Sequence, residues 1–359
     1  MNKKEIEQYL LENLNMALDP KTGETSYTNG FDIRANENGF KFIPRLPSSF
    51  IVNDDLYERI YEISNVALYP EYTVLKQNGA YIISEEINDI HIQRALFFPW
   101  LKGIPRRLIV SNLDSKPSNQ IQLMQDLAVD YDKVTSIAIA GNSGSGKTYF
   151  LLYLLQNLKY ISNLAIVDPK LDSPARWGRD NNIKIIYPNA NRSKADFVNQ
   201  VNNELSIACN LINTRQRQLF SNPTLTFKHH TVVIDEVLAL TEGVPKQIKD
   251  SFYALLSQIA LMGRATNVHL ILVSQRFDHN TIPIAVREQL NVLIQIGNIN
   301  SKTTQFLFPD LDPTGIVIPT GIGTGLIQII DAEHPYQIQP FLTPTYNLKG
   351  ESINEKRSY

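Results

Sequence analysis

The chain has 359 residues, 43% of them hydrophobic, which is enough for one large domain or two ordinary ones with apolar cores. Its single cysteine, Cys209, excludes an intrachain disulfide and a zinc site built on several thiolates, and predicts a reducing, cytoplasmic compartment. The formal net charge of −2 excludes only a global attraction to nucleic acid, because a local basic stripe would not show in that total.

The first 115 residues are predicted to form a smaller α+β domain. The opening segment carries apolar residues at helical spacing, namely Ile6, Leu10, Leu11 and Leu14. The segment YTVLKQNGAYIIS (72–84) predicts a β-hairpin that turns at Asn78 and Gly79. The polar segment 111–120 predicts the domain boundary. The N-terminus lacks the apolar stretch of a signal peptide, and no long uncharged apolar run occurs, so we expect a soluble chain with no transmembrane segment of its own.

From residue 120 to residue 340, short apolar runs alternate with helical patterns. The runs are SIAIAG (136–141), NLAIVDP (163–169), IKIIYP (183–188), TVVIDE (231–236), HLILVSQ (269–275), NVLIQIG (291–297) and GLIQIID (325–331). Most are continuous rather than alternating, which is typical of strands buried on both faces. We therefore expect an α/β domain over 120–340, with a mostly parallel sheet flanked by helices, and a polar tail over 341–359.

The segment GNSGSGKT (141–148) fits the phosphate-binding pattern G-x-x-x-x-G-K-[ST], with a strand before it and a strong helix former after it. Lys147 would bridge the β- and γ-phosphates of ATP, and the Thr148 hydroxyl would ligate Mg²⁺. The alternative is a glycine-rich turn without a ligand. The residues predicted to bind the nucleotide are Gly141, Asn142, Ser143, Gly144, Ser145, Gly146, Lys147 and Thr148.

Two carboxylates, Asp235 and Glu236, follow the apolar run at 231–234. Adjacent acids at the edge of a buried strand are unfavourable unless a cation meets them, and Mg²⁺ with ATP is the partner we predict. Asp235 would hold the metal through water, and Glu236 would accept a proton from the attacking water. The alternative is a strand end that carries acids at a turn. Asp168 and Lys170 end another strand, and we interpret them equally as residues near the nucleotide or the DNA path, or as an ordinary turn.

The segment LMGRATNVHLILVSQRFD (261–278) places an apolar strand between Arg264 and Arg276. With the phosphate loop, LAIVDPK, TVVIDEVLAL and INSKTTQFLF, it resembles the FtsK/SpoIIIE family of DNA-translocating ATPases, close to the HerA-type motors, over residues 120 to 330. Family members carry Gly-Arg-Ala, Gly-Ile-His, an apolar strand and Thr-Gln-Arg-Pro. This chain has Asn267 where the family has the second glycine, and Phe277 in place of the proline.

The resemblance implies a RecA-like core that assembles as a homo-oligomeric ring, a hexamer, with double-stranded DNA in its pore. It implies that Gln275 senses the γ-phosphate and that Arg264 is an arginine finger acting on the ATP of a neighbouring subunit. The alternative for Arg264 is a solvated cation at a helix end. Arg276 is either a coupling residue or part of a structural ion pair.

Full-length FtsK-type proteins add N-terminal membrane helices, and the chromosome-segregating members add a C-terminal winged-helix domain; we expect neither here. The leading prediction is an ATP-driven double-stranded DNA translocase of a plasmid, integrative conjugative element or phage, in particular a conjugation coupling protein. A relaxase or a membrane-channel protein is the partner expected, and it would recruit the cytoplasmic ring to the inner face of the membrane. The alternatives are a phage-packaging or replication-associated motor, and a nucleotide-gated adaptor that binds DNA or relaxase without pumping.

Overall fold

The computed structural model describes residues 2–18, 30–45, 52–77, 82–111, 118–278, 281–309, 311–331 and 336–347. Their contacts divide the chain into two compact units. The first unit comprises Met1–Pro105, Asp312–Pro319 and Ala332–Pro340. The second comprises Arg106–Leu311, Thr320–Asp331 and Phe341–Tyr359.

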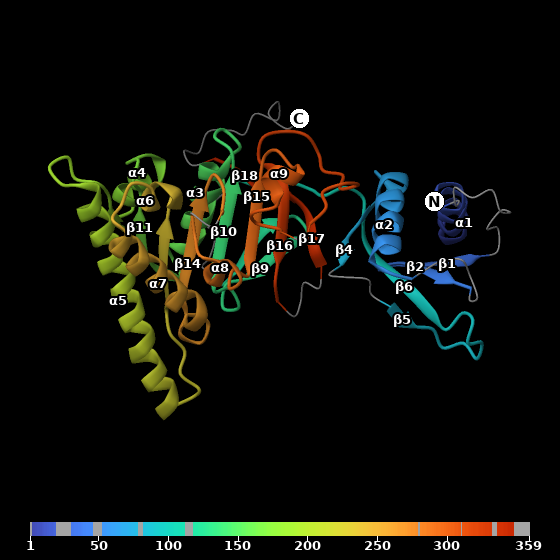
Figure 1. Ribbon diagram of the computed structural model, residues 1–359, viewed down its shortest axis with the longest axis horizontal. Coiled ribbons are helices and arrows are strands. Elements are labelled where there is room, and N and C mark those ends of the chain that lie inside the picture. The colour runs from blue at the N-terminus through green and yellow to red at the C-terminus, as the bar shows by residue number, and fades with distance from the viewer. Residues whose placement is uncertain are drawn as a thin grey trace. The chain divides into compact units, whose positions relative to one another are not determined.

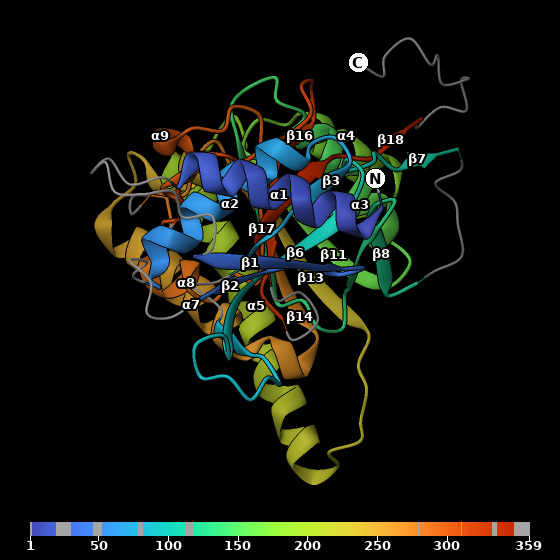
Figure 2. The same ribbon diagram turned by 90° about the vertical axis from the view of Figure 1, so that its right-hand side faces the viewer.

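The first unit is an antiparallel sheet with two helices packed on one face (Figure 1 and Figure 2). The strands follow the order β1-β2-β6-β3, and β5 also pairs with β6. Apolar side chains of the helices and the sheet, among them Leu10, Tyr57 and Phe98, form one core. The elements are α1 (Lys3–Ala17), β1 (Phe31–Asn36), β2 (Gly39–Pro44), α2 (Asp54–Leu68), β3 (Tyr72–Val74), β4 (Lys76–Gln77), β5 (Ile82–Ser84) and β6 (Arg94–Lys102).

The predicted N-terminal helix is α1, and its residues Ile6, Leu10 and Leu14 are buried as the spacing predicted. The hairpin prediction over 72–84 is wrong for the described residues. Both β3 and β5 pair with β6, and β4 pairs with β17 (Tyr336–Leu342), which runs from the first unit into the second. The nine residues of β6 provide enough backbone donors and acceptors for several partners. The predicted turn at Asn78 and Gly79 lies outside the described residues.

The main sheet of the second unit contains all seven predicted apolar runs. Its strands lie in the order β12-β11-β13-β14-β10-β15-β16, and they are parallel except for the pairing of β15 with β16. The mostly parallel α/β prediction is therefore confirmed. The strands are β10 (Ser136–Gly141), β11 (Ser162–Val167), β12 (Lys184–Ile186), β13 (His229–Ile234), β14 (Val268–Ser274), β15 (Val292–Ile296) and β16 (Thr324–Ile329).

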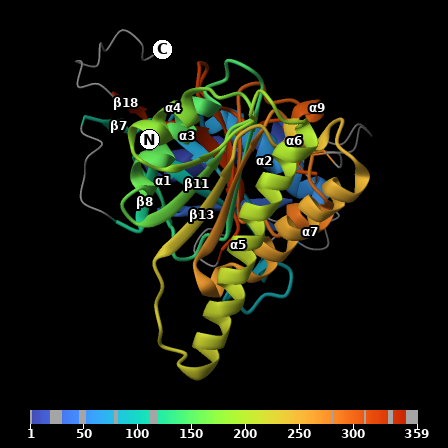
Figure 3. The same cartoon turned by 90° about the vertical axis from the view of Figure 1, so that its left-hand side faces the viewer.

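Helices cover both faces of this sheet. Alternate strand residues such as Ile139, Val233 and Ile271 share one apolar cluster with α3 (Lys147–Leu158) and with Trp177 of α4 (Ser173–Asp180). Helix α5 (Lys194–Ser221) runs beside α7 (Lys246–Met262), and both contact β14, as does α6 (Val237–Thr241) (Figure 3). The sheet is thus buried on both faces, which explains its continuous apolar runs.

Short elements complete the second unit. They are β7 (Ile109–Val110), β8 (Gln120–Met124), β9 (Leu127–Asp130), the 3-10 turn η1 (Arg264–Thr266), α8 (Ile284–Arg287), α9 (Ser301–Thr304) and β18 (Thr345–Tyr346). The predicted tail begins at residue 341, yet Phe341, Leu342 and Tyr346 are buried in strands β17 and β18. Residues 348–359 lie outside the described part. Within the described chain, no helix has both the length and the apolar character that crossing a bilayer requires.

Candidate nucleotide-binding site

The predicted phosphate loop joins the end of β10 to the start of α3. Gly141, Gly144 and Gly146 have φ values of 152°, 77° and 106°, which L side chains rarely adopt. A Cβ at Gly141 would also lie 2.2 Å from the Ile296 carbonyl oxygen of the neighbouring β15. Backbone amides can curl around an anion in this conformation, and the N-terminus of α3 adds a favourable field.

The segment that carries Gly323 lies against the phosphate loop, a contact that was not predicted from the sequence. The Gly323 amide donates to the Ser145 carbonyl at 3.0 Å. Arg107 fixes the segment that carries Gly323, because its guanidinium donates to the Ile322 carbonyl at 2.8 Å and to the Thr343 carbonyl at 2.9 Å. The glycine-rich run at 321–325 is the sequence signal that could have indicated this close approach.

Lys147 connects the phosphate loop to the predicted acidic pair. Its Nζ donates to the carbonyl of Gly141 at 2.5 Å and to that of Asn142 at 3.0 Å. Burial lowers the pKa of this ammonium, while the charges of Glu236 and Asp235 act to raise it. The phosphate loop and the two acids therefore form one electrostatic site.

Asp235 follows β13, in the middle of the sheet, and is 9% exposed. Burial, together with the charges of Asp168 and Glu236, raises the pKa of its carboxyl to about 6, against the opposing effect of Lys170 and Lys147. The positive charges within the protein therefore do not fully offset burial and the neighbouring acids, and a bound cation would stabilise the ionised carboxylate.

Glu236 has a left-handed backbone, with φ 55° and ψ 63°, at the residue that precedes α6. Its carboxylate accepts from Lys170 Nζ at 2.6 Å. The Glu236 side chain is 10% exposed and that of Lys170 is 53% exposed. The hydrogen bond to Glu236 raises the pKa of Lys170. Lys170 thus lies beside the acidic pair, and its place near a nucleotide or the DNA path stays a prediction.

Asp168 is fully buried and serves the turn after β11. Its carboxylate accepts from the backbone amides of Lys170 and Asp172 at 2.9 Å and of Ala175 at 3.1 Å. These bonds fix the loop that carries Lys170 and satisfy amides at the start of α4. Asp168 therefore positions the loop through its carboxylate.

Two predicted residues of the segment 261–278, Gln275 and Arg264, lie at opposite ends of strand β14. Gln275 is exposed and follows β14, which lies between the acidic strand β13 and the phosphate-loop strand β10. Arg264 is exposed and precedes β14, at the amino-terminal edge. Because β14 is seven residues long and extended, about 20 Å of strand separates the two edges. Arg264 therefore does not join the site of its own chain.

Arg276 pairs with Asp278, whose carboxylate is 2.8 Å from Arg276 Nε. This contact agrees with the structural ion pair that the sequence left as one of two alternatives. Asn267 has the left-handed backbone expected of the position where the family carries glycine, with φ 51°. The Asn267 side chain also donates to the Phe227 carbonyl at 2.9 Å, so asparagine adds a bond that glycine lacks.

The site offers the groups that a nucleotide with a divalent cation requires. The Ser145 hydroxyl is buried and has no hydrogen-bond partner among the described residues. Nothing described lies within 4 Å of a Cβ built on Gly144, so the loop is open on that side. Thr148 and Asp235 supply oxygen ligands of the kind that Mg²⁺ prefers, and Lys147 supplies a positive charge. The residues present therefore fit Mg²⁺ and a nucleoside triphosphate.

The sequence profile of the AAA domain matches residues 131–281, which include the phosphate loop, the acidic pair and β14. Over 199 residues the chain is 23% identical to the FtsK domain-containing protein YdcQ of Bacillus subtilis (strain 168). That alignment covers 54% of this chain and 40% of YdcQ. These matches support an FtsK-like P-loop ATPase.

The fold agrees with that of one solved structure, and a second is reported for comparison. The pCW3 conjugation coupling protein TcpA, solved as a monomer with ATPγS, is similar at a TM-score of 0.51 and 15% identity, over 95% of this chain and 94% of that one. EssC (ATPases 2 and 3) from Geobacillus thermodenitrificans has a TM-score of 0.49 and 17% identity, over 72% of this chain and 50% of that one. At these identities the likeness to TcpA concerns the fold.

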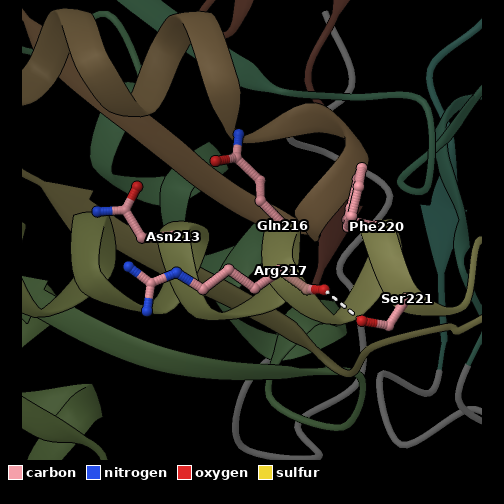
Figure 4. Close-up of a pocket in the computed structure, with 5 residues that line it drawn as sticks. All are labelled: Asn213, Gln216, Arg217, Phe220 and Ser221. Carbon is pink, nitrogen blue, oxygen red and sulfur yellow. Dashed lines mark hydrogen bonds between the residues drawn. The ribbon is translucent and has the colours of Figure 1, made fainter.

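A hollow on the outer part of α5 is separate from the nucleotide site of the ATPase. It is lined by Asn213, Gln216, Arg217, Phe220 and Ser221 (Figure 4). The end of α5 leads into the start of β13, so this hollow belongs to the amino-terminal edge of the sheet, whereas the phosphate loop follows the carboxyl-terminal edge. Phe220 is 92% exposed. The hollow therefore lies apart from this chain's own phosphate loop.

Proposed function

We propose that this ATPase couples hydrolysis to the movement of double-stranded DNA for a mobile genetic element, as a conjugation coupling protein. The observation that carries the proposal is that the predicted catalytic residues lie at the two opposite ends of the parallel strands of one sheet. Lys147, Asp235 and Glu236 meet at the carboxyl-terminal edge, and Arg264 is exposed at the other. A site divided in this way is completed by the Arg264 of a second subunit, which is the arrangement of a ring motor.

The names of the similar proteins support the DNA-related part of the proposal. YdcQ is described as an FtsK domain-containing protein, and TcpA as a conjugation coupling protein. The chain spans 40% of the length of YdcQ, so the double-stranded DNA substrate, the hexameric ring and a relaxase or membrane-channel partner are all parts of this proposal.

In the proposed reaction, Lys147 and the loop amides bind the phosphates, and Thr148 and Asp235 hold Mg²⁺. The bound metal would neutralise charge on the transferring phosphoryl group. Glu236 accepts the proton of the attacking water, and Gln275 senses the γ-phosphate. Arg264 contributes positive charge to the ATP of the adjacent subunit, where such fingers add about 10³ to 10⁵ in rate.

The test of DNA coupling is ATP hydrolysis by the purified protein with and without double-stranded DNA. We expect DNA to raise the rate, and Lys147→Ala and Glu236→Gln to abolish hydrolysis, with Glu236→Gln still binding nucleotide. Lys4→Ala, an exposed residue of α1, is the control and should leave the rate unchanged. Hydrolysis that responds to no form of DNA would contradict the proposal.

The test of the shared site is to mix two inactive variants. Lys147→Ala cannot use its own phosphate loop but retains Arg264, whereas Arg264→Ala retains the loop. If Arg264 acts across an interface, mixing the two proteins restores hydrolysis at sites that combine an intact loop with an intact finger. If the mixture stays inactive while each variant still assembles with wild-type protein, Arg264 is a solvated surface cation and does not act on a neighbouring ATP.

A further inference from the structure

The outer end of helix α5 projects beyond the turn that carries Arg264. Arg215 donates to the Thr266 carbonyl at 2.6 Å, so this residue of α5 lies beside η1. Residues 216–221 continue the helix past that point by about 9 Å, at a rise of about 1.5 Å per residue. Figure 1 and Figure 3 show this end of α5 extending beyond α7 and the strands of the sheet. The tip of α5, residues 216–221, is therefore a projection from the amino-terminal edge of the sheet.

The tip exposes an aromatic ring and polar donors. Phe220 is 92% exposed. Figure 4 shows Gln216 and Phe220 on the same side of the helix, as their spacing of four residues requires, and both line the hollow together with Arg217. Within the described part of the chain, the side chains of Gln216 and Arg217 form no hydrogen bond or ion pair. Aromatic and arginine side chains of this kind are the ones that interfaces between proteins use as anchors.

We propose that the tip of α5 docks on a second copy of this chain, on the face of that copy that contains its phosphate loop, with Phe220 as the anchor. The inference rests on the role proposed above for Arg264. A neighbour whose ATP receives Arg264 approaches this chain at the amino-terminal edge of the sheet, and the tip projects from the same edge. The contact fixes how far Arg264 enters the neighbouring site.

Charge favours a second copy as the partner. Residues 205–234 contain no Asp or Glu, whereas the whole chain has 36 acidic residues and a net charge of −2. The tip and the loop after it therefore present Arg217 and Lys228, both exposed, to a partner whose remaining surface is net acidic. A firm hold on a DNA backbone uses about six to ten phosphate contacts, which two exposed cations do not supply. An intact duplex also offers no unstacked base to the ring of Phe220.

The first experiment measures assembly by sedimentation velocity, with a non-hydrolysable ATP analogue and magnesium and without DNA. For Phe220→Asp we expect the protein concentration at half-assembly to rise by about tenfold or more, because a charge replaces the anchor. Phe220→Leu keeps an apolar side chain and should stay within about threefold of wild type. Met16→Asp places the same charge at a residue of the first unit that is 84% exposed, and should leave assembly unchanged. Assembly of Phe220→Asp at the wild-type concentration would overturn the proposal, and so would a wild-type protein that stays monomeric.

The second experiment identifies what the tip contacts. The photo-cross-linking residue p-benzoylphenylalanine replaces Phe220 in an equal mixture of isotope-labelled and unlabelled protein, which is irradiated with the ATP analogue, magnesium and double-stranded DNA. We expect cross-links that join a labelled peptide to an unlabelled one, which only two copies can form, at the loops that follow β11 and β13. Cross-links confined to one copy, or formed to DNA, would overturn the proposal.

The mixing test of the shared site separates the tip from the proposed function. Adding Phe220→Asp to the Lys147→Ala partner, which supplies Arg264, should lower the restored hydrolysis several-fold at limiting protein concentration. Restored hydrolysis that is unaffected would overturn the docking of the tip while the role of Arg264 stands. Loss of assembly in Phe220→Asp, together with hydrolysis that ignores DNA in wild type, would support the docking and contradict DNA translocation.

Discussion

The guanidinium of Arg215 donates to the Thr266 carbonyl at 2.6 Å, and so ties the middle of α5 to the turn that carries Arg264. The same side chain donates to the Lys228 carbonyl at 2.9 Å and lies over the Phe227 ring. This buried arginine therefore satisfies backbone carbonyls from two loops at once. Arg264 is exposed on a turn whose backbone is fixed by the hydrogen bond from Arg215 to the Thr266 carbonyl. This suits a residue that must reach another subunit in a fixed orientation.

Replacing Arg215 with methionine should lower the free energy of unfolding by about 2 to 4 kcal/mol, because buried carbonyls lose their donors while much of the packing stays. The measurement is urea unfolding followed by circular dichroism. Arg217→Met, an exposed position on the same helix, should change stability by less than about 0.5 kcal/mol. Equal stabilities for the two variants would show that Arg215 does not hold the turn.

Gly141 and Gly144 of the phosphate loop are required for different reasons. At Gly141 a side chain would clash with a neighbouring strand, whereas at Gly144 only the backbone conformation is unfavourable for other residues. In Gly141→Ala the new Cβ would lie 2.2 Å from the Ile296 carbonyl, so β10 and β15 must move apart. In Gly144→Ala nothing described lies within 4 Å, and only the left-handed φ of 77° is penalised, by about 1 to 2 kcal/mol. We expect urea unfolding to show a clearly larger loss for Gly141→Ala. A larger loss for Gly144→Ala would contradict this packing.

Neutralising Asp235 should stabilise the protein while it removes activity. The ionised carboxylate is buried beside Asp168 and Glu236, so Asp235→Asn should raise the free energy of unfolding by about 1 to 3 kcal/mol in a metal-chelating buffer at neutral pH. Thermal unfolding measures this change, with the exposed Asp126→Asn as the control. Added magnesium and ATP should stabilise wild type more than the variant. A destabilised variant would show that the acid is compensated within the protein.

Acid should destabilise the sheet through two buried histidines. His229 Nδ1 lies 2.8 Å from His269 Nε2, and His269 Nδ1 lies 2.6 Å from the Val134 carbonyl, to which it donates. Burial, with the charges of His229 and Arg215, lowers the pKa of His269 to about 3, and burial lowers that of His229 despite the opposing charge of Asp132. Folded histidines stay neutral, whereas unfolded ones take up protons below a pKa of about 6.5.

The stabilising effect is therefore complete above a pH of about 6.5 and is lost as the pH falls toward the folded pKa. We expect the free energy of unfolding to drop by about 2 kcal/mol through His269 between about pH 7 and pH 5, with a further loss in the same direction through His229. Urea unfolding across that range should show a shallower slope for His269→Gln than for wild type. His91→Gln, at an exposed position, should keep the wild-type slope. Unchanged slopes in both variants would contradict the assignment.

Local patterns in the sequence were sufficient to predict the strands of the main sheet and the position of the glycine-rich loop. Buried parallel strands give continuous apolar runs, and a loop that surrounds a phosphate needs glycines followed by lysine and a hydroxyl, so both features appear in consecutive residues. The same holds for Asp235 and Glu236, which follow a strand that can be recognised by itself. The hairpin predicted at 72–84 failed because β6, which begins ten positions after the end of β5, paired with both β3 and β5.

Only the tertiary structure decided which of the remaining polar residues meet. Arg107 reaches the segment beside the phosphate loop from more than 200 residues away, and Arg215 reaches the turn of Arg264 from 51 residues away. Lys170 and Glu236 are 66 residues apart and meet because β11 and β13 are neighbours in register, which no local spacing encodes. The sequence alone determined the kinds of chemistry available at each strand end, because those depend on consecutive residues. The order of the strands brought the separate ends together, because pairing between strands joins residues that are distant in the chain.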